Sequence, residues 1–305
     1  FNCLRIQTWD SNVPILIERC TILESGTRFA LQAPKGWVQM EEILCQQKMT
    51  NKDRAVKSLS LILPMYNEQD VVFPLVKRLI PVLWKLRRRW QIQLILVNDG
   101  SVDDTQALIE KHFSILPWAE TVILEHESNR GLGAAMATGF AAATGDVVCT
   151  LDADCTYSPE KIEALIDCLE KTDCDIVTAS PYHPAAQDPS ASKWRVFLWR
   201  GASWMYMMLS PTPLYCYTSF FRVYRREWTD RRFFNAPDFL AVTEILLLAA
   251  CAGARVEEFP LRLGLRAYGR SKMHLARSVC NHLRLMSRIL IMRFQGRKGF
   301  REQSA

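Results

Sequence analysis

From residue 58 onward, short apolar runs alternate with longer amphipathic stretches. The apolar runs, rich in β-branched and aliphatic residues, predict strands at residues 59–63, 94–98, 121–124, 147–151 and 175–179. Helical periodicity fills the intervals near residues 68–88, 103–115, 132–143 and 158–171. Such alternation predicts an α/β fold in which a mostly parallel sheet is covered by helices on both faces.

The rhythm changes after residue 180. The pattern predicts a strand at 217–225, an apolar helix near 239–252, strands near 255–259 and 261–267, and a last helix from about 272 to 294. The residues at helical spacing on this last helix are Ala276, Val279, Leu283, Met286, Leu290 and Phe294, while Arg277, Arg284 and Arg288 share another face. Residues 1–57 show no sustained periodicity. We therefore expect an N-terminal extension (1–57), a main domain (58–271) and a basic amphipathic C-terminal helix and tail (272–305).

Composition places the chain among globular proteins, because 49% of its 305 residues are hydrophobic and 23% are charged. The longest uncharged apolar stretch, residues 245–254, is about half of the roughly 18 to 20 residues that a bilayer requires, so no membrane-spanning helix is expected. The ten cysteines show no C-x-x-C pair and no other zinc spacing. Cysteines of this kind favour a reducing, cytoplasmic compartment.

The net charge of +6 is unevenly distributed, because residues 255–305 hold twelve Lys or Arg and only three Glu. A basic C-terminal segment indicates an anionic partner. No helix-turn-helix, zinc-finger or RNP-like pattern accompanies it, so nucleic acid is not expected. The apolar, arginine-bearing stretches 194–209 and 272–294 favour peripheral contact with the cytosolic face of a membrane. The alternative is a pair of core helices whose arginine heads reach solvent.

Four polar segments follow predicted strands, at the edge where an open α/β sheet forms its ligand crevice. They are residues 64–68 (P-M-Y-N-E), 98–105 (N-D-G-S-V-D-D-T), 152–154 (D-A-D) and 266–272 (R-A-Y-G-R-S-K). In the third segment two carboxylates flank one small residue. One of them can hold Mg²⁺ or Mn²⁺, which prefer hard oxygen ligands, while the other orients a ribose. The alternative is a polar turn in which Asp154 caps a helix beginning near Pro159.

Asp99 comes one residue after a run of four apolar residues, 94–97. Its carboxylate is therefore expected at the carboxyl edge of the sheet, where it can accept hydrogen bonds from a nucleobase or ribose. The alternative is a turn formed by Asp-Gly-Ser, with Asp103 capping the next helix. The glycine-rich segment 129–139 lacks the G-x-G-x-x-G spacing of dinucleotide enzymes. Its small residues are expected to allow close helix packing, and an oxidoreductase is rejected.

Together the four segments resemble the family 2 glycosyltransferases of the GT-A fold, and within them the polyprenyl (dolichyl) phosphate mannosyl- and glucosyltransferase-like group. The patterns P-x-Y-N-E, D-G-S-x-D-x-T, D-A-D and R-x-Y-G-x-S-K occur in the family's order across residues 58–275. The resemblance implies a metal-dependent, inverting transfer of a hexose from a nucleotide-diphosphate sugar to a polyprenyl phosphate. It implies GDP-mannose as the preferred donor, with a UDP-hexose as the alternative.

The resemblance also implies roles for individual residues. The residues implied as nucleoside contacts are Pro64, Tyr66, Glu68, Val97, Asp99, Asp152 and Ala153. Asp154 becomes the metal ligand, and Thr156 stands where the family usually carries a metal-assisting Gln. Arg266 and Lys272 match positions that contact phosphate, and their alternative is a solvated basic strand end. A cationic pair closing over a pyrophosphate would stabilise the charge of the leaving nucleotide.

The acceptor half departs from the family pattern. The G-x-R-Y pattern of the lipid-phosphate enzymes reads Ala179-Ser180-Pro181-Tyr182 here, without the arginine. Arg195 matches an arginine proposed to meet the acceptor phosphate, but the Ser expected four residues later is Trp199. A phosphate acceptor needs cations and no general base. A sugar or alcohol acceptor needs a carboxylate, for which Glu244 is the first candidate and Asp238 the second.

Three functions therefore remain open at this point. The first is transfer to a polyprenyl phosphate at a membrane surface. The second is a soluble family 2 transferase that uses Glu244 as general base, although Glu244 could equally be a carboxylate favoured at a helix start by the dipole. The third is a nucleotide-sugar-binding protein without turnover.

Overall fold

The computed structural model describes residues 57–114, 116–186, 203–230, 234–264 and 275–294, the last of these with side chains for residues 281–291. The chain divides into two units, Phe1–Val56 and Lys57–Ala305, and every described residue belongs to the second. Residues 1–57 were expected to form an extension, and all but the last lie outside the described residues.

The described strands form one seven-stranded sheet in the order β3-β2-β1-β4-β6-β5-β7. Their bounds are β1 Ser58–Met65, β2 Gln91–Asn98, β3 Glu120–Glu125, β4 Val147–Thr150, β5 Ile176–Ser180, β6 Arg222–Arg225 and β7 Val256–Pro260. Strand β6 runs antiparallel to both β4 and β5, and all other neighbouring strands are parallel. The mostly parallel sheet predicted from the sequence is confirmed.

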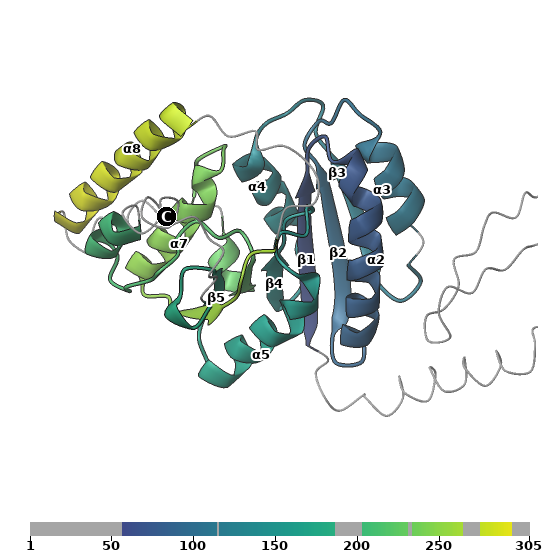
Figure 1. Ribbon diagram of the computed structural model, residues 1–305, viewed down its shortest axis with the longest axis horizontal. Coiled ribbons are helices and arrows are strands. Elements are labelled where there is room, and N and C mark those ends of the chain that lie inside the picture. Colours follow the sequence, from purple (N-terminus) through teal and green to yellow (C-terminus); the bar gives the residue numbers. More distant parts are fainter. Residues whose placement is uncertain (1–56, 115, 187–202, 231–233, 265–274, 295–305) are drawn as a thin grey trace, which may run out of the picture. The chain divides into compact units, whose positions relative to one another are not determined.

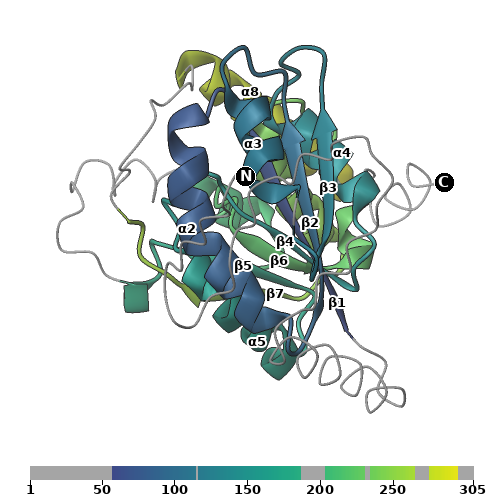
Figure 2. The same ribbon diagram turned by 90° about the vertical axis from the view of Figure 1, so that its right-hand side faces the viewer.

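Helices cover both faces of this sheet (Figures 1 and 2). One face carries α2 (Gln69–Leu86), α3 (Thr105–Phe113) and α5 (Ile162–Thr172). The other carries α4 (Leu132–Ala142), α7 (Leu240–Ala252) and α8 (Leu275–Phe294). Residues 203–209 are also helical, and short 3₁₀ turns lie at η1 (Pro159–Lys161), η2 (Pro184–Ala186) and η3 (Arg226–Thr229).

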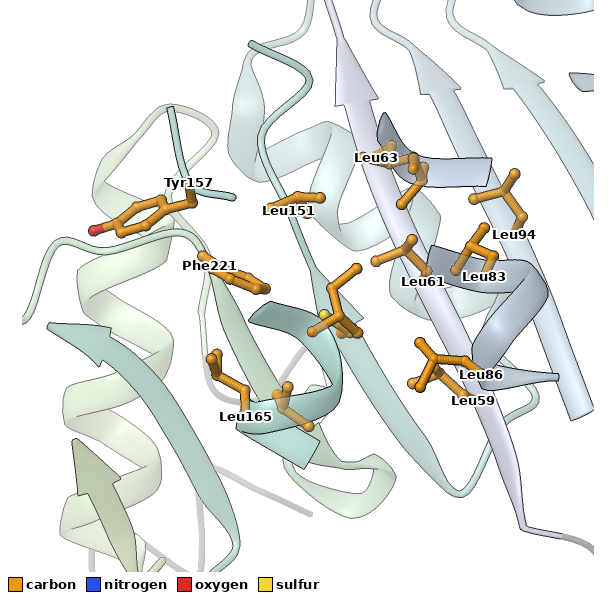
Figure 3. Packing of buried hydrophobic residues seen from close by; sticks show 14 of the residues in the cluster. Leu59, Leu61, Leu63, Leu83, Leu86, Leu94, Leu151, Tyr157, Leu165 and Phe221 are labelled. Carbon is orange, nitrogen blue, oxygen red and sulfur yellow. The ribbon is translucent and has the colours of Figure 1, made fainter. Parts of the chain in front are cut away.

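Burial on both faces explains the continuous apolar runs of the central strands. On β1, Leu59, Leu61 and Leu63 belong to the core under α2 and α5, and Ile62 belongs to the core under α4 and α7. Figure 3 shows Leu61 beside Leu83 of α2, and Leu59 beside Leu86. On the opposite face of the sheet, α4 packs close to β1. A Cβ added at Gly139 of α4 would lie 2.5 Å from Cγ2 of Ile62, so the small residues of α4 do permit close packing.

Two predicted strands are shorter or absent. Only Arg222–Arg225 of the predicted strand 217–225 pairs in the sheet, because preceding backbone carbonyls accept hydrogen bonds from side chains: that of Tyr217 from Arg222 at 2.7 Å, and that of Phe220 from Thr150 at 2.6 Å. Residues 261–264 form no strand, because the chain leaves β7 there and Gly264 N–H donates to the Thr156 carbonyl at 2.8 Å. The remainder of the predicted strand 261–267 lies outside the described residues.

The last helix is confirmed, but its buried face differs from the predicted stripe. Leu285 and Ile289 are buried in the core beneath α8, whereas Leu283 and Leu290 are exposed by 52% and 45%. The apolar spacing alone allowed either face. The packing against α7 selects the face that carries Leu285 and Ile289, and it leaves an apolar face of α8 uncovered by the described residues.

Candidate functional site

Three of the four polar segments meet at one edge of the sheet. Strands β2, β1 and β4 are neighbours and run parallel, so the loops that follow Met65, Asn98 and Thr150 leave from the same end. The register pairs Met65 with Asn98 and Ile62 with Thr150. The loops carrying residues 64–68, 98–105 and 152–154 therefore lie at one edge of the sheet, as expected. The fourth segment, 266–272, lies outside the described residues.

Hydrogen bonds join the first two loops directly. Asn67 lies in the left-handed region with φ 52°; its N–H donates to Ser101 Oγ at 2.9 Å, and its Oδ1 accepts the N–H of Val102 at 2.9 Å. The N–H of Glu68 donates to Thr105 Oγ1 at 2.8 Å. These hydrogen bonds hold the segment that carries the half-buried residues 64, 66 and 68 beside the loop that follows β2.

Asp103 was expected to cap α3, but the N-cap of this helix is Asp104, and Asp103 supports the helix start from one position earlier. Its Oδ1 accepts the N–H of Thr105 at 3.1 Å, at the first residue of α3, and its Oδ2 accepts the N–H of Gln69 at 3.3 Å. The carboxylate therefore ties the starts of α2 and α3 together. It shapes the loop and is not aimed at a ligand.

Asp99 is buried, and three hydrogen bonds hold its carboxylate in place. Its Oδ1 accepts His126 Nδ1 at 2.6 Å and the N–H of Arg130 at 2.9 Å, and its Oδ2 accepts the N–H of Gly131 at 2.8 Å. The side chain retains 5% of its surface. Asp99 therefore holds the loop after β3 against the end of β2, and whatever it offers a ligand comes from the remaining edge of its carboxylate.

The same loop is held from its far side by the segment before α7. The carbonyl of Pro237 accepts the N–H of Gly133 at 2.8 Å and that of Ala134 at 3.3 Å, which satisfies donors in the first turn of α4. Gly131 lies at φ 90°, and a Cβ there would stand 2.4 Å from the same carbonyl oxygen. Glycine is therefore required at position 131, both for its backbone conformation and for this close approach.

The D-A-D segment leaves β4 into a tight turn. Asp154 Oδ1 accepts the N–H of Thr156 at 2.9 Å, and Cys155 between them lies at φ 53°. Ala153 is buried, while Asp152 and Asp154 are half-buried. Ser158, rather than Asp154, precedes η1, so the helix-capping alternative for Asp154 does not describe this turn.

Arg78 of α2 supports this turn from outside. Its guanidinium donates to the Cys155 carbonyl at 3.4 Å and to Glu160 Oε2 at 2.9 Å. Burial alone would raise the pKa of Glu160, but hydrogen bonds from Arg78 and Ser158 outweigh it and lower that pKa to about 2. The turn that presents Asp154 is thus anchored to a helix by an ionised carboxylate.

Comparison with known proteins identifies the family of this chain. A family model described as glycosyl transferase family 2 matches residues 60–233, which is more than half of the chain. The chain belongs to glycosyl transferase family 2. It is 27% identical to dodecaprenyl-phosphate galacturonate synthase of Rhizobium johnstonii, over 82% of this chain and 72% of the relative. It is 26% identical to polyprenol monophosphomannose synthase of Mycolicibacterium smegmatis, over 72% of this chain and 82% of the relative.

A solved structure supports the same fold. The crystal structure of glucosyl-3-phosphoglycerate synthase from Mycobacterium tuberculosis, in complex with Mn²⁺, UDP and glucosyl-3-phosphoglycerate, aligns with a TM-score of 0.56 at 17% identity. The match covers 88% of this chain and 86% of that chain. This likeness concerns the fold, and it confirms the GT-A architecture. The chain is therefore a GT-A hexosyltransferase of family 2, resembling the dolichyl-phosphate mannosyltransferase group.

Within this transferase, the turn after β4 offers oxygen atoms that suit a divalent cation. Thr156 Oγ1 is buried and has no hydrogen-bond partner among the described residues, two positions from the half-buried Asp154. The described part of the chain holds no group of three or more His, Cys, Asp or Glu side chains placed to bind a metal. One carboxylate and one hydroxyl nevertheless fit Mg²⁺ or Mn²⁺, which commonly complete their coordination with substrate phosphates and water.

Both carboxylates considered as general bases have structural partners. Glu244 of α7 is buried; its Oε2 accepts the N–H groups of Asn235 and Ala236 at 2.7 and 2.8 Å, and its Oε1 accepts Arg288 at 2.8 Å. Asp238 accepts the N–H of Leu240 at 3.0 Å and the Asn281 amide at 3.0 Å. Glu244 therefore holds the loop before α7 and joins it to α8.

The remaining predicted residues divide into two groups. Val97 is fully buried in the core under α4, so its side chain is not exposed to a ligand. The cationic candidates Arg195, Arg266 and Lys272 lie outside the described residues and stay predictions. His126, the buried partner of Asp99, was not expected at the site. A lone histidine 27 positions away carries no spacing signal that would have revealed the pair.

Proposed function

We propose that this transferase moves a hexose from a nucleotide-diphosphate donor to a polyprenyl phosphate at a membrane surface. The observation that carries the acceptor assignment is the commitment of Glu244 to three structural hydrogen bonds. A sugar or alcohol acceptor must lose a proton to a base, whereas a phosphate monoester is already a nucleophile at neutral pH. Because Glu244 is already hydrogen-bonded to three donors, a phosphate acceptor is favoured over a sugar or alcohol acceptor.

The names of the relatives support the same acceptor class. One is a dodecaprenyl-phosphate galacturonate synthase and another a polyprenol monophosphomannose synthase. Their sugars differ, so the sugar of this chain is not fixed by relatedness, and GDP-mannose is one of the donors to be tested. We assign the base and ribose to the crevice lined by Tyr66, Glu68 and Asp99, with Pro64, Val97, Asp152 and Ala153 beside them. Arg195, Arg266 and Lys272 are assigned to the donor and acceptor phosphates.

We assign a divalent cation to Asp154, with Thr156 Oγ1 as a second oxygen. Bound there, Mg²⁺ or Mn²⁺ would neutralise charge on the diphosphate as the nucleotide leaves. The chain itself positions these oxygens through the turn that Arg78 supports. That support keeps the carboxylate side chain in one orientation.

The proposed membrane contact rests on an exposed apolar surface. Helix 203–209 and α8 together expose Trp204 by 62%, Met208 by 64%, Leu283 by 52% and Ile291 by 55%. Trp204, Met208 and Leu283 border a shallow apolar groove between the two helices. The chain from residue 272 to its end holds eight Lys or Arg and one Glu, which suits anionic lipid. No helix in the described part of the chain is long and apolar enough to cross a membrane.

The test is transfer by the purified chain with UDP-glucose, UDP-N-acetylglucosamine or GDP-mannose in Mg²⁺ or Mn²⁺, with and without a short polyprenyl phosphate in liposomes. We expect a lipid-linked sugar that Asp154→Ala abolishes. Nucleotide release that sugars or alcohols stimulate and polyprenyl phosphate does not would assign the soluble alternative instead. Donor binding without release or product for any donor and acceptor would favour a protein that binds nucleotide sugars without turnover.

A further inference from the structure

A buried histidine is hydrogen-bonded to one carboxylate oxygen of Asp99. His126 is 7% exposed; its Nδ1 lies 2.6 Å from Asp99 Oδ1 and its Nε2 lies 2.9 Å from Thr138 Oγ1 on α4. The backbone N–H of His126 also donates to the Asn98 carbonyl at 2.9 Å. The side chain of Asp99 also accepts the backbone N–H groups of Arg130 and Gly131, so we assign Nδ1 as the donor of the His126–Asp99 bond. The ring is therefore fixed in place from two sides.

The hydrogen bonds that Asp99 accepts can be compared with the number of lone pairs on its carboxylate. A carboxylate offers about four lone-pair positions, two on each oxygen. His126 and the N–H of Arg130 take both positions on Oδ1, and the N–H of Gly131 takes one on Oδ2. Among the described residues nothing else is seen to bond Asp99, so one acceptor position remains, on Oδ2. The two oxygens together cannot receive a parallel pair of N–H groups from a ligand.

This single position distinguishes the bases of nucleotide donors. The pairing edge of guanine carries two adjacent donors, the ring N1–H and the exocyclic amine, which match a carboxylate with both oxygens open. The edge of uracil carries one donor, N3–H, between two carbonyl oxygens. At Asp99 guanine would find an acceptor for only one of its two donors, whereas the single donor of uracil would be matched.

We propose that His126 is a specificity-determining positioning residue, which occupies Oδ1 of Asp99 so that the site takes a uridine-diphosphate donor in preference to a guanosine-diphosphate donor. This inference rests on the proposed function, in which the donor's base lies against Asp99. It departs from the GDP-mannose expected from the family resemblance. His126 acts through Asp99 and needs no contact with the sugar or the acceptor.

The test is isothermal titration calorimetry of UDP and GDP with Mg²⁺ on the full chain and on three variants. The wild type should bind UDP at least about tenfold more tightly than GDP, because an unpartnered buried donor carries a penalty of that order. His126→Leu removes the donor to Oδ1 and should bring the ratio of the two affinities toward one. His126→Asn keeps an N–H near the position of Nδ1 and should retain the ratio.

Thr138→Val is the matched control, since it removes the hydroxyl on Nε2 and leaves the His126–Asp99 bond in place. A merely structural role of His126 would weaken both nucleotides equally in His126→Leu, and that result would overturn the proposal. GDP binding as tight as UDP in the wild type would also overturn it while leaving the glycosyltransferase assignment intact. If neither nucleotide binds the folded wild type, the proposed donor site itself is wrong. Should His126→Leu fail to fold, the wild-type ratio decides.

Discussion

Arg288 of α8 donates to Glu244 of α7 at 2.8 Å, and the same carboxylate holds two backbone N–H groups of the loop before α7. The carboxylate is 4% exposed, whereas the guanidinium is 45% exposed. The ion pair thus links the outermost described helix to the loop whose Pro237 carbonyl meets the first turn of α4. Through Glu244 and this loop, α8 is linked to the start of α4.

Replacement of Glu244 by Gln should destabilise the protein without removing chemistry. The amide nitrogen cannot accept from the backbone or from Arg288, so a buried donor loses its partner. We expect the free energy of unfolding to fall by about 2 to 4 kcal/mol, measured in urea, while turnover per folded molecule stays within about tenfold. Replacement of the exposed Glu257 by Gln is the control, and it should change stability by less than about 0.5 kcal/mol. A loss of turnover near 1,000-fold at unchanged stability would instead make Glu244 a general base.

Asp154 and Thr156 should both affect the metal requirement, to different degrees. Asp154→Asn removes the charged ligand, and we expect kcat/KM to fall at least about 100-fold, with a higher Mn²⁺ concentration needed for half-maximal rate. Thr156→Val removes only the hydroxyl and should cost about tenfold in metal affinity, whereas Thr156→Ser should keep it. Equal metal dependence in Thr156→Val and Thr156→Ser would show that this hydroxyl is not a ligand.

The Glu160 contact with Arg78 should depend on pH. Because the folded-state pKa is lowered to about 2 from an ordinary value of 4.5, the contact stabilises the protein above pH 4.5 and loses this effect as the pH falls toward 2. The stability difference between wild type and Glu160→Gln should be constant near neutral pH and shrink below pH 4.5. The pair is partly exposed, so the difference should not exceed about 1 kcal/mol. Thermal melting at several pH values measures it, and a difference that grows on acidification would contradict the assignment.

The fold could be predicted from the sequence because its signals are local. Each central strand is a short apolar run. The intervals between the strands show helical periodicity and are long enough for a helix, and they predicted α2, α3, α4 and α5. The buried face of α8 could not be predicted in the same way. Two apolar stripes of that helix have nearly the same spacing, and the choice between Leu283 and Leu285 depends on α7, which is distant in sequence.

The site was predictable as a set of loops but not as a network. The strand ends placed Asp99 and Asp154 at one edge, since parallel strands align their carboxyl ends. The partners of these side chains are largely backbone N–H groups, such as those of Gly131 and Thr156, and backbone donors leave no mark in the amino-acid pattern. Two of the three donors to Glu244 are likewise backbone N–H groups, and the third, Arg288, lies 44 positions away, so the sequence pattern reveals none of them.

Gly131 offers a strict test of how the crevice is assembled. Alanine at this position meets two obstacles, a φ of 90° and a Pro237 oxygen 2.4 Å from the new Cβ. Gly253, at the end of α7, provides the matched control, since its φ is 106° but no atom lies within 4 Å of the corresponding Cβ. We expect Gly253→Ala to cost about 1 kcal/mol of unfolding free energy and Gly131→Ala about 3 kcal/mol or more. Gly131→Ala should also weaken nucleotide binding, because the N–H of residue 131 orients Asp99. Equal costs for the two variants would mean that the loop shifts away from Pro237 freely, and nucleotide affinity in Gly131→Ala would then remain at the wild-type value.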